Sequence, residues 1–216
     1  MDRRKALRNM GLALGYTVAT PTLISIMQSC KNERVLEWTP DFFTQDEGAA
    51  LIKLVDIIIP KTDIPSASET QVHLFIDRFA NEVMDEKQQK FWKMSFARFL
   101  EKAQTDSGED KAGNLTAENL EAVLGPALKV TKENQTKNFK AIEQYNEAIA
   151  QGRESLLDDS ISRFGFANNL RGLTIMGYKT SEFVGEEVLA YLPVPGEYIA
   201  CGDLQELTGG KAWSIS

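Results

Sequence analysis

The sequence contains very few of the residues from which common haem and metal sites are built. Its 216 residues include one histidine, His73, and two cysteines, Cys30 and Cys201. Covalent c-type haem requires a Cys-x-x-Cys-His segment and a structural zinc site requires several Cys or His ligands, so the sequence excludes both. His73 is not part of a Glu-x-x-His segment either, so a carboxylate-bridged di-iron bundle has no support.

The motifs of nucleotide-binding and hydrolytic enzymes are missing as well. No Gly-x-Gly, no Gly-x-x-x-x-Gly-Lys-Ser/Thr and no Gly-x-Ser-x-Gly occurs in the chain. Dinucleotide binding, a phosphate-binding loop and an α/β-hydrolase nucleophile therefore have no signature here. The adjacent Asp158 and Asp159 face different sides of a helix and fit a helix N-terminus better than an acid–base pair. We expect no catalytic residue, cofactor or metal in this chain.

Positive charge is scarce in most of the chain. The net charge is −7 and residues 1–29 contribute +3, so the chain from Cys30 onward carries −10. Such an acidic chain repels phosphate backbones, and no basic stripe with interleaved aromatic residues occurs, which excludes nucleic acid as a partner. With 43% hydrophobic and 25% charged residues, the composition is that of a globular protein.

Residues 1–29 have the order of a bacterial export signal. Arg3 and Arg4 lie in a basic start, and the apolar run that follows is diluted by glycine, threonine and proline. A membrane-spanning helix needs about 20 predominantly apolar residues, so this run fits a twin-arginine signal better. An ordinary amphipathic N-terminal helix is the alternative.

Cys30 ends the apolar run, and polar residues follow it at once, as in the lipobox of bacterial lipoproteins. Lipidation of Cys30 would hold an exported protein at a membrane, facing the periplasm or the cell exterior. A buried or disulfide-bonded thiol is the alternative. We divide the chain into a signal at 1–29, a linker at 30–39 and a helical domain at 40–216.

The pattern of that domain predicts an all-α fold of about six helices. Thr44 and Glu47 form a capping box, and Pro60 ends the first helix. The later helices follow from apolar residues that recur at helical spacing. The expected helices are 44–59, 72–83, 85–103, 116–124, 134–151 and 156–177. We interpret the aromatic residues of the third helix as core and His73 as a surface or packed residue.

The C-terminal segment differs from the helical body. Pro193 and Pro195 are incompatible with a helix or a central strand and favour an extended chain. Such a chain cannot satisfy its own backbone polar groups when buried, so it lies over a surface, its own or that of a partner.

Three segments have distinctive motifs. They are Ile59–Pro65, which reads Ile-Pro-Lys-Thr-Asp-Ile-Pro; Gly177–Glu182, which reads Gly-Tyr-Lys-Thr-Ser-Glu; and Leu189–Cys201, which contains Pro-Val-Pro-Gly. With these motifs the sequence resembles the gluconate 2-dehydrogenase subunit 3 family. The twin-arginine start is also usual in that family. The resemblance covers most of residues 40–203.

The resemblance implies a role as an accessory subunit. In this family a small subunit pairs with a large FAD-dependent flavoprotein of the glucose–methanol–choline type, often alongside a cytochrome c that carries haem. The large subunit oxidises the sugar or sugar acid, and the small one supports its folding, export and membrane attachment. The residues expected at the partner interface are Tyr178, Thr180, Ser181, Glu182, Tyr191, Pro193, Pro195, Gly196 and Tyr198.

Cys201 would be the one thiol left after lipidation of Cys30, in a protein exported to an oxidising compartment. An odd cysteine there suggests an intermolecular bond, so Cys201 is a candidate for a disulfide with the large subunit, with a buried free thiol as the alternative.

Two other functions compete with the accessory role. The first is a free-standing exported lipoprotein that binds a small ligand such as a sugar, with Trp38, Trp92, Trp213 and Tyr198 lining the site. The second is a stand-alone oxidoreductase, which lacks every nucleotide and metal signature named above.

Overall fold

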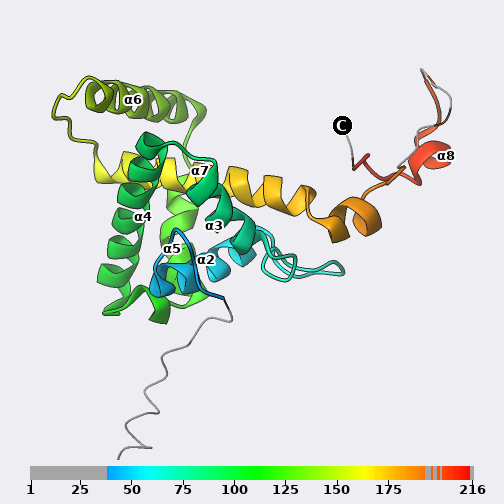
Figure 1. Ribbon diagram of the computed structural model, residues 1–216, viewed down its shortest axis with the longest axis horizontal. Helices are drawn as coiled ribbons and strands as arrows, with labels where there is room; N and C mark the ends of the chain where they lie inside the picture. The colour runs from blue at the N-terminus through cyan, green and yellow to red at the C-terminus, as the bar shows by residue number, and fades with distance from the viewer. Residues whose placement is uncertain (1–37, 193–195, 197–198, 200, 215–216) are drawn as a thin grey trace, which may run out of the picture. The chain divides into compact units, whose positions relative to one another are not determined.

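The computed structural model describes residues 38–192, 196, 199 and 201–214, which belong to one compact unit. Several of the residues singled out in the sequence lie outside the described ranges: Arg3, Arg4, Cys30, Pro193, Pro195 and Tyr198. The helices, in chain order, are α2 (Gln45–Ile58), α3 (Val72–Glu82), α4 (Glu86–Ser107), the 3-10 helix η1 (Ala112–Asn114), α5 (Ala117–Leu128), α6 (Lys132–Ala150), α7 (Asp159–Lys179), the π-helix η2 (Val184–Val188) and α8 (Leu204–Thr208) (Figure 1).

The described residues form no strand, which confirms the all-α prediction. Ala190 and Trp213 form an isolated parallel β-bridge, which does not extend into a strand.

Side-chain caps explain where several helices begin. The Thr44 hydroxyl accepts the backbone N–H of Glu47, and the Glu47 carboxylate accepts that of Thr44 at 2.8 Å, which starts α2 as predicted. Asp85 caps α4, and Gly108 ends it in the left-handed conformation. Asp158 caps α7, and hydrogen bonds from Ser160 hold the pKa of the Asp158 carboxyl below its ordinary value.

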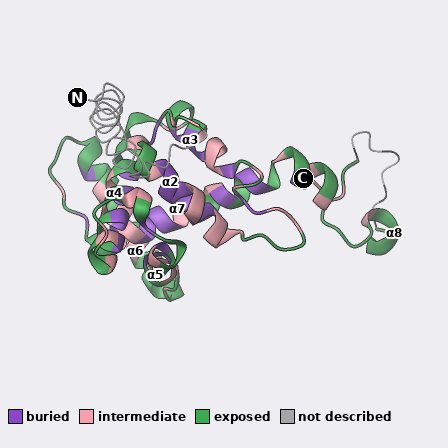
Figure 2. Ribbon diagram, turned by 90° about the horizontal axis from the view of Figure 1, so that it is seen from below, coloured by how far each residue is buried: buried purple, intermediate pink, exposed green. Residues whose placement is uncertain are grey.

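Helix α7 is the central element of the core. It packs against α2, α3, α4, α5 and α6, and Figure 2 colours much of its length as buried. Phe166 of α7 stacks on Phe96 of α4 with ring centroids 4.6 Å apart, and Trp92 and Phe99 contact the same ring. The prediction that the aromatic residues of the third helix form core is confirmed, because Phe91, Trp92, Phe96 and Phe99 are all buried.

Several helix boundaries differ from those predicted. Gly125 and Pro126 do not end α5, which continues to Leu128 with a hydrogen bond from the Lys129 N–H to the Gly125 carbonyl at 2.9 Å. A proline in the last turn removes one hydrogen bond without blocking the residues that follow. Helix α4 runs on to Ser107, beyond the predicted end at 103, and α8 had no counterpart among the expected helices.

Candidate partner-binding surface

The first two family segments meet in the structure. The Tyr178 hydroxyl at the end of α7 donates a hydrogen bond of 2.7 Å to the Pro65 carbonyl in the loop after α2. Beside it, Gly177 lies so close to α3 that a Cβ would come within 2.5 Å of Cδ1 of Phe75. These two residues therefore fasten the C-terminal end of α7 to α3 and to the loop.

This arrangement corrects the prediction for Tyr178. The tyrosine was expected at the partner interface, but its side chain is 7% exposed and packs in the core. Burial also raises the pKa of its phenol. The Tyr178 ring packs in the core and its hydroxyl bonds to Pro65, so Tyr178 supports the motif segments from inside the domain.

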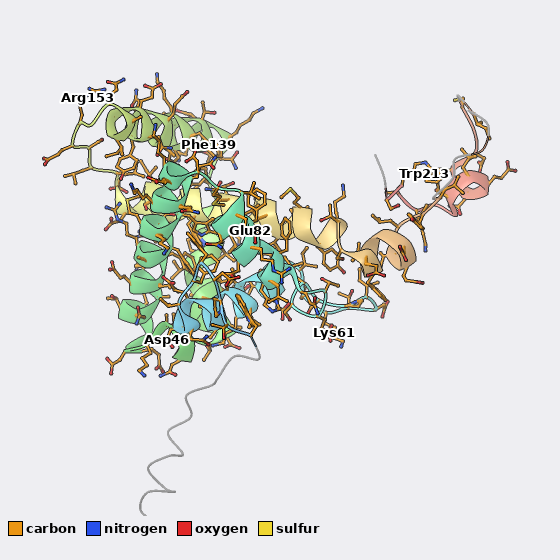
Figure 3. All side chains as sticks on the ribbon, viewed as in Figure 1. Asp46, Lys61, Glu82, Phe139, Arg153 and Trp213 are labelled. Atoms are coloured by element: carbon orange, nitrogen blue, oxygen red, sulfur yellow. The ribbon has the colours of Figure 1, made fainter. Side chains whose placement is uncertain are left out.

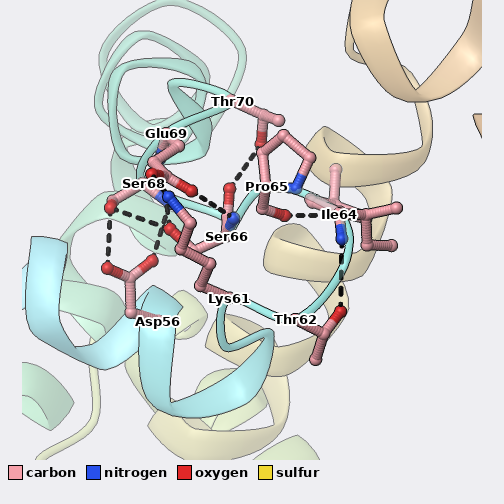
Figure 4. A network of polar contacts seen from close by, with 10 residues as sticks. Asp56, Lys61, Thr62, Ile64, Pro65, Ser66, Ser68, Glu69 and Thr70 are labelled. Carbon is pink, nitrogen blue, oxygen red and sulfur yellow. Dashed lines mark hydrogen bonds and ion pairs between the residues drawn. The ribbon is translucent and has the colours of Figure 1, made fainter. Parts of the chain in front are cut away.

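The loop between α2 and α3, residues 60–71, is held by a network of polar contacts, and we call it the motif loop (Figure 4). The Asp56 carboxylate accepts the backbone N–H of Ser68 at 2.7 Å and its hydroxyl at 2.6 Å. Glu69 pairs with Lys61 and accepts the Ser66 N–H at 2.9 Å. The hydrogen bond from Lys61 is the main cause of a lowered Glu69 pKa. These contacts fix the conformation of the motif loop, and Lys61 lies at its exposed end (Figure 3).

The second segment has three exposed polar residues, Lys179, Thr180 and Glu182. The Thr180 hydroxyl donates to the Met176 carbonyl at 2.9 Å, and the Ser181 hydroxyl donates to the Tyr178 carbonyl at 2.7 Å. Both hydroxyls therefore satisfy carbonyls at the end of α7. Glu182 is exposed, and the neighbouring Phe183 is 45% exposed.

The third segment opens a loop that closes on itself. The Ala190 N–H donates to the Ala212 carbonyl at 2.8 Å, and the Ser214 N–H donates to the Ala190 carbonyl at 3.0 Å. We call residues 190–213 the C-terminal loop; it includes α8. Tyr191 and Gly196 of the predicted interface are exposed on it, which leaves them accessible to a partner.

Cys201 also lies in the C-terminal loop. It is exposed and carries a free thiol in this structure, so the alternative of a buried cysteine is not observed. An exposed thiol can reach a partner cysteine, whereas a buried one cannot.

The tryptophans proposed for a sugar site do not gather at one place. Trp92 is 1% exposed in the core, and Trp38 packs against His73 with ring centroids 5.6 Å apart. Trp213 is in the C-terminal loop, bridged to Ala190. A buried tryptophan cannot stack on a sugar, so Trp92 does not line such a site, and Tyr198 lies outside the described residues.

His73 is a packed residue, in agreement with the sequence interpretation. Burial against Trp38 lowers the pKa of its imidazole, and the charge of Asp56 opposes that shift in part. The His73 Nδ1 and the Trp38 Nε1 are both buried without a hydrogen-bond partner.

The sequence interpretation missed the buried carboxylate of Asp77. It is 1% exposed on α3 and accepts three backbone N–H groups, from Asp41 at 2.8 Å, Phe42 at 3.0 Å and Phe43 at 3.2 Å. Asp77 therefore fastens the segment before α2 to α3. Asp77 lies about 100° around the helix from Ile76, outside the apolar stripe, so the spacing of apolar residues gave no signal of its burial.

Within the described ranges, no helix is both long and apolar enough to cross a membrane. The same residues include no group of three or more His, Cys, Asp and Glu side chains placed to hold a metal ion.

The fold and these loops define the class first: an all-α domain whose motif residues shape a surface around the end of one central helix. The particular family follows from the sequence profile described as Gluconate 2-dehydrogenase subunit 3, which matches residues 45–196. The match covers more than half of the chain, and the protein belongs to that family. Searches of curated proteins and of solved structures gave no match.

Proposed function

We propose that this chain is the non-catalytic small subunit of an FAD-dependent sugar or sugar-acid dehydrogenase whose large subunit is a glucose–methanol–choline flavoprotein. The observation that carries the proposal is the family match, because the family is described as a subunit of gluconate 2-dehydrogenase. In such a complex the large subunit holds FAD and oxidises the substrate. A cytochrome c with haem c is a further proposed member.

The surface around the end of α7 supports this role. The motif loop presents a polar tip, and the C-terminal loop presents apolar side chains, Tyr191 at 44% exposure and Trp213 at 43%. Exposed aromatic side chains are typical of protein–protein interfaces. Glu182 is exposed in the second segment, together with Lys179 and Thr180, and is proposed to contact the large subunit.

Export and anchoring form the finer part of the proposal. Arg3 and Arg4 would direct a folded complex through the twin-arginine route, which carries a flavoprotein already loaded with FAD. Lipid on Cys30 would then hold the complex at the membrane, with the domain on the periplasmic or cell-surface side.

Co-expression tests the proposal. The flavoprotein of the source organism is produced with and without this chain, and flavin content and sugar oxidation are measured in the membrane fraction. With the chain, we expect FAD and activity in the membrane fraction; with Arg3→Lys/Arg4→Lys, both remain in the cytoplasm. The chain purified alone should show no flavin absorbance. Stoichiometric flavin bound to the isolated chain would overturn the proposal.

A further inference from the structure

The part of the C-terminal loop around α8, residues 201–213, has a defined shape although no residue of α8 is buried. The Asp203 carboxylate accepts the Gln205 N–H at 2.8 Å and the Glu206 N–H at 3.2 Å, and Gly209 ends the helix with φ of 63°. Leu207 packs against Gly202, where a Cβ would lie 2.7 Å from it. A five-residue helix is too short to be stable by itself. Its caps therefore specify the shape of α8 without burial in a core, and the hydrogen bonds of Ala190 hold the residues that follow it.

Apolar side chains concentrate in this loop. Six of the 13 exposed large apolar side chains that the structure describes belong to it: Tyr191 at 44%, Leu192 at 47%, Ile199 at 51%, Leu204 at 59%, Leu207 at 39% and Trp213 at 43%. No extensive contact joins α8 to another of the described helices, and Figure 2 colours it as exposed. Single exposed apolar residues are ordinary, but such a concentration marks an interaction site.

The charge of the same region says which kind of partner fits. Residues 182–213 contain six acidic side chains and one basic side chain, Lys211. Two copies of this loop would repel each other, and an anionic lipid surface would repel it as well. A complementary partner therefore has an apolar groove with lysine or arginine at its rim.

We propose that the C-terminal loop docks through α8 into such a groove on the large flavoprotein subunit; the identity of the partner rests on the proposed function. Leu204 and Leu207 are three residues apart and lie on one face of α8, so they can enter the groove together. Because its caps already hold α8 in shape, α8 loses little conformational entropy on docking. Docking would also place Cys201, which lies in the same loop, at the interface.

The test measures binding of the full chain to the purified flavoprotein subunit in detergent. Reductant is present, so that Cys201 cannot form a bond that masks the non-covalent affinity. The variant Leu204→Glu/Leu207→Glu places two charges in the groove and should weaken binding by about 30-fold or more. Neither leucine is buried, so thermal unfolding of the variant should match that of the wild type.

Leu156→Glu is the matched control. Leu156 is 96% exposed and precedes α7, whereas the C-terminal loop follows α7. A helix of 21 residues separates the two positions by about 30 Å. Binding of this control should stay within about twofold of the wild type, because an exposed leucine outside the interface contributes little.

Charge gives a second readout. Wild-type binding should weaken as salt is raised, and Glu186→Gln/Glu187→Gln/Glu206→Gln should make the salt dependence shallower. An unchanged salt dependence in this triple variant would contradict the basic rim.

The outcomes separate the two proposals. If the wild-type chain does not bind the flavoprotein, both the proposed function and this inference are overturned. If the wild type binds and the double leucine variant binds equally well, this inference alone is overturned. Self-association of the wild type, or binding to phosphatidylglycerol vesicles, that the double variant abolishes would assign the loop to a second copy or to lipid. Either result would also overturn the inference.

Discussion

At the scale of single residues, the buried Asp77 and the partly buried His73 hold the start of the domain to α3. Asp77 collects three backbone N–H groups from the segment before α2, and His73 packs beside Trp38 of the same segment. If the proposed lipid on Cys30 is present, this segment lies between the anchor and the helical body. Its attachment therefore determines where the anchored chain enters the fold.

Asp77→Ala should lower the free energy of unfolding by about 3 kcal/mol, because three backbone donors lose their acceptor in a mostly buried place. Urea denaturation followed by circular dichroism measures the loss. Asp63→Ala is the control, since Asp63 is exposed on the motif loop and should change stability by less than about 0.5 kcal/mol. Equal stability of the two variants would show that the carboxylate at position 77 is dispensable.

His73 should make the free energy of unfolding depend on pH near 6.5, its ordinary pKa. No other type of side chain in this sequence has an ordinary pKa close to that value. Burial lowers the pKa of folded His73 below the ordinary 6.5, so the unfolded chain takes up a proton first as the pH falls. The stabilisation is complete above pH 6.5 and is lost as the pH falls through the folded pKa.

Chemical denaturation between about pH 7.5 and pH 5.5 measures this effect, because 6.5 is the pKa of an unperturbed histidine. Stability should fall with falling pH in the wild type and change less in His73→Phe, which keeps an aromatic ring beside Trp38. His73 is the one histidine of the chain, so parallel curves for the two proteins would remove it as the cause.

At the scale of elements, close packing of α7 on α3 decides how the family segments come together. Gly177 lets Phe75 approach, and Tyr178 then reaches Pro65 across a sequence separation of 113 residues. The motif loop and the end of α7 form one surface because of these two contacts.

A pair of substitutions in α7 tests that packing. Gly177→Ala adds a Cβ 2.5 Å from the Phe75 ring, so overpacking of about 1–3 kcal/mol should outweigh the helix propensity gained. Gly172→Ala meets no atom within 4 Å and should stabilise the helix by up to about 1 kcal/mol. The two melting temperatures should therefore move in opposite directions. A rise in both melting temperatures would mean that α7 and α3 move apart to accept the new Cβ without loss of stability.

Local signals in the sequence predicted the helices well, and non-local contacts limited the rest. The capping box of Thr44 and the aromatic spacing of α4 are readable within a few residues. The contact of Tyr178 with Pro65 and the bridge of Ala190 with Trp213 join distant segments, which periodicity does not encode. The burial of Tyr178 was therefore missed, although its segment was identified.

At the scale of the whole molecule, the polar motif loop contacts the end of the central helix α7, and the apolar C-terminal loop follows that helix in the chain. Both belong to an acidic chain that carries −10 from Cys30 onward. The account predicts that this surface meets a partner with the opposite charge.

Cys201 offers a covalent test of the same contact. The thiol is exposed in the C-terminal loop, so a disulfide with the large subunit should form after export. On a non-reducing gel of the native complex, the two chains should migrate together, and Cys201→Ser should separate them. Separate migration of the wild-type chains, with Cys201 labelled by a thiol reagent in the folded complex, would contradict this bond.

The most direct test of the accessory role is purification of this chain from native membranes, followed by mass spectrometry and an absorption spectrum. The account predicts that a glucose–methanol–choline flavoprotein co-purifies in stoichiometric amount and that the flavin absorbance belongs to it. Recovery of the chain alone, without flavoprotein or flavin, from membranes that contain the active dehydrogenase would contradict the account.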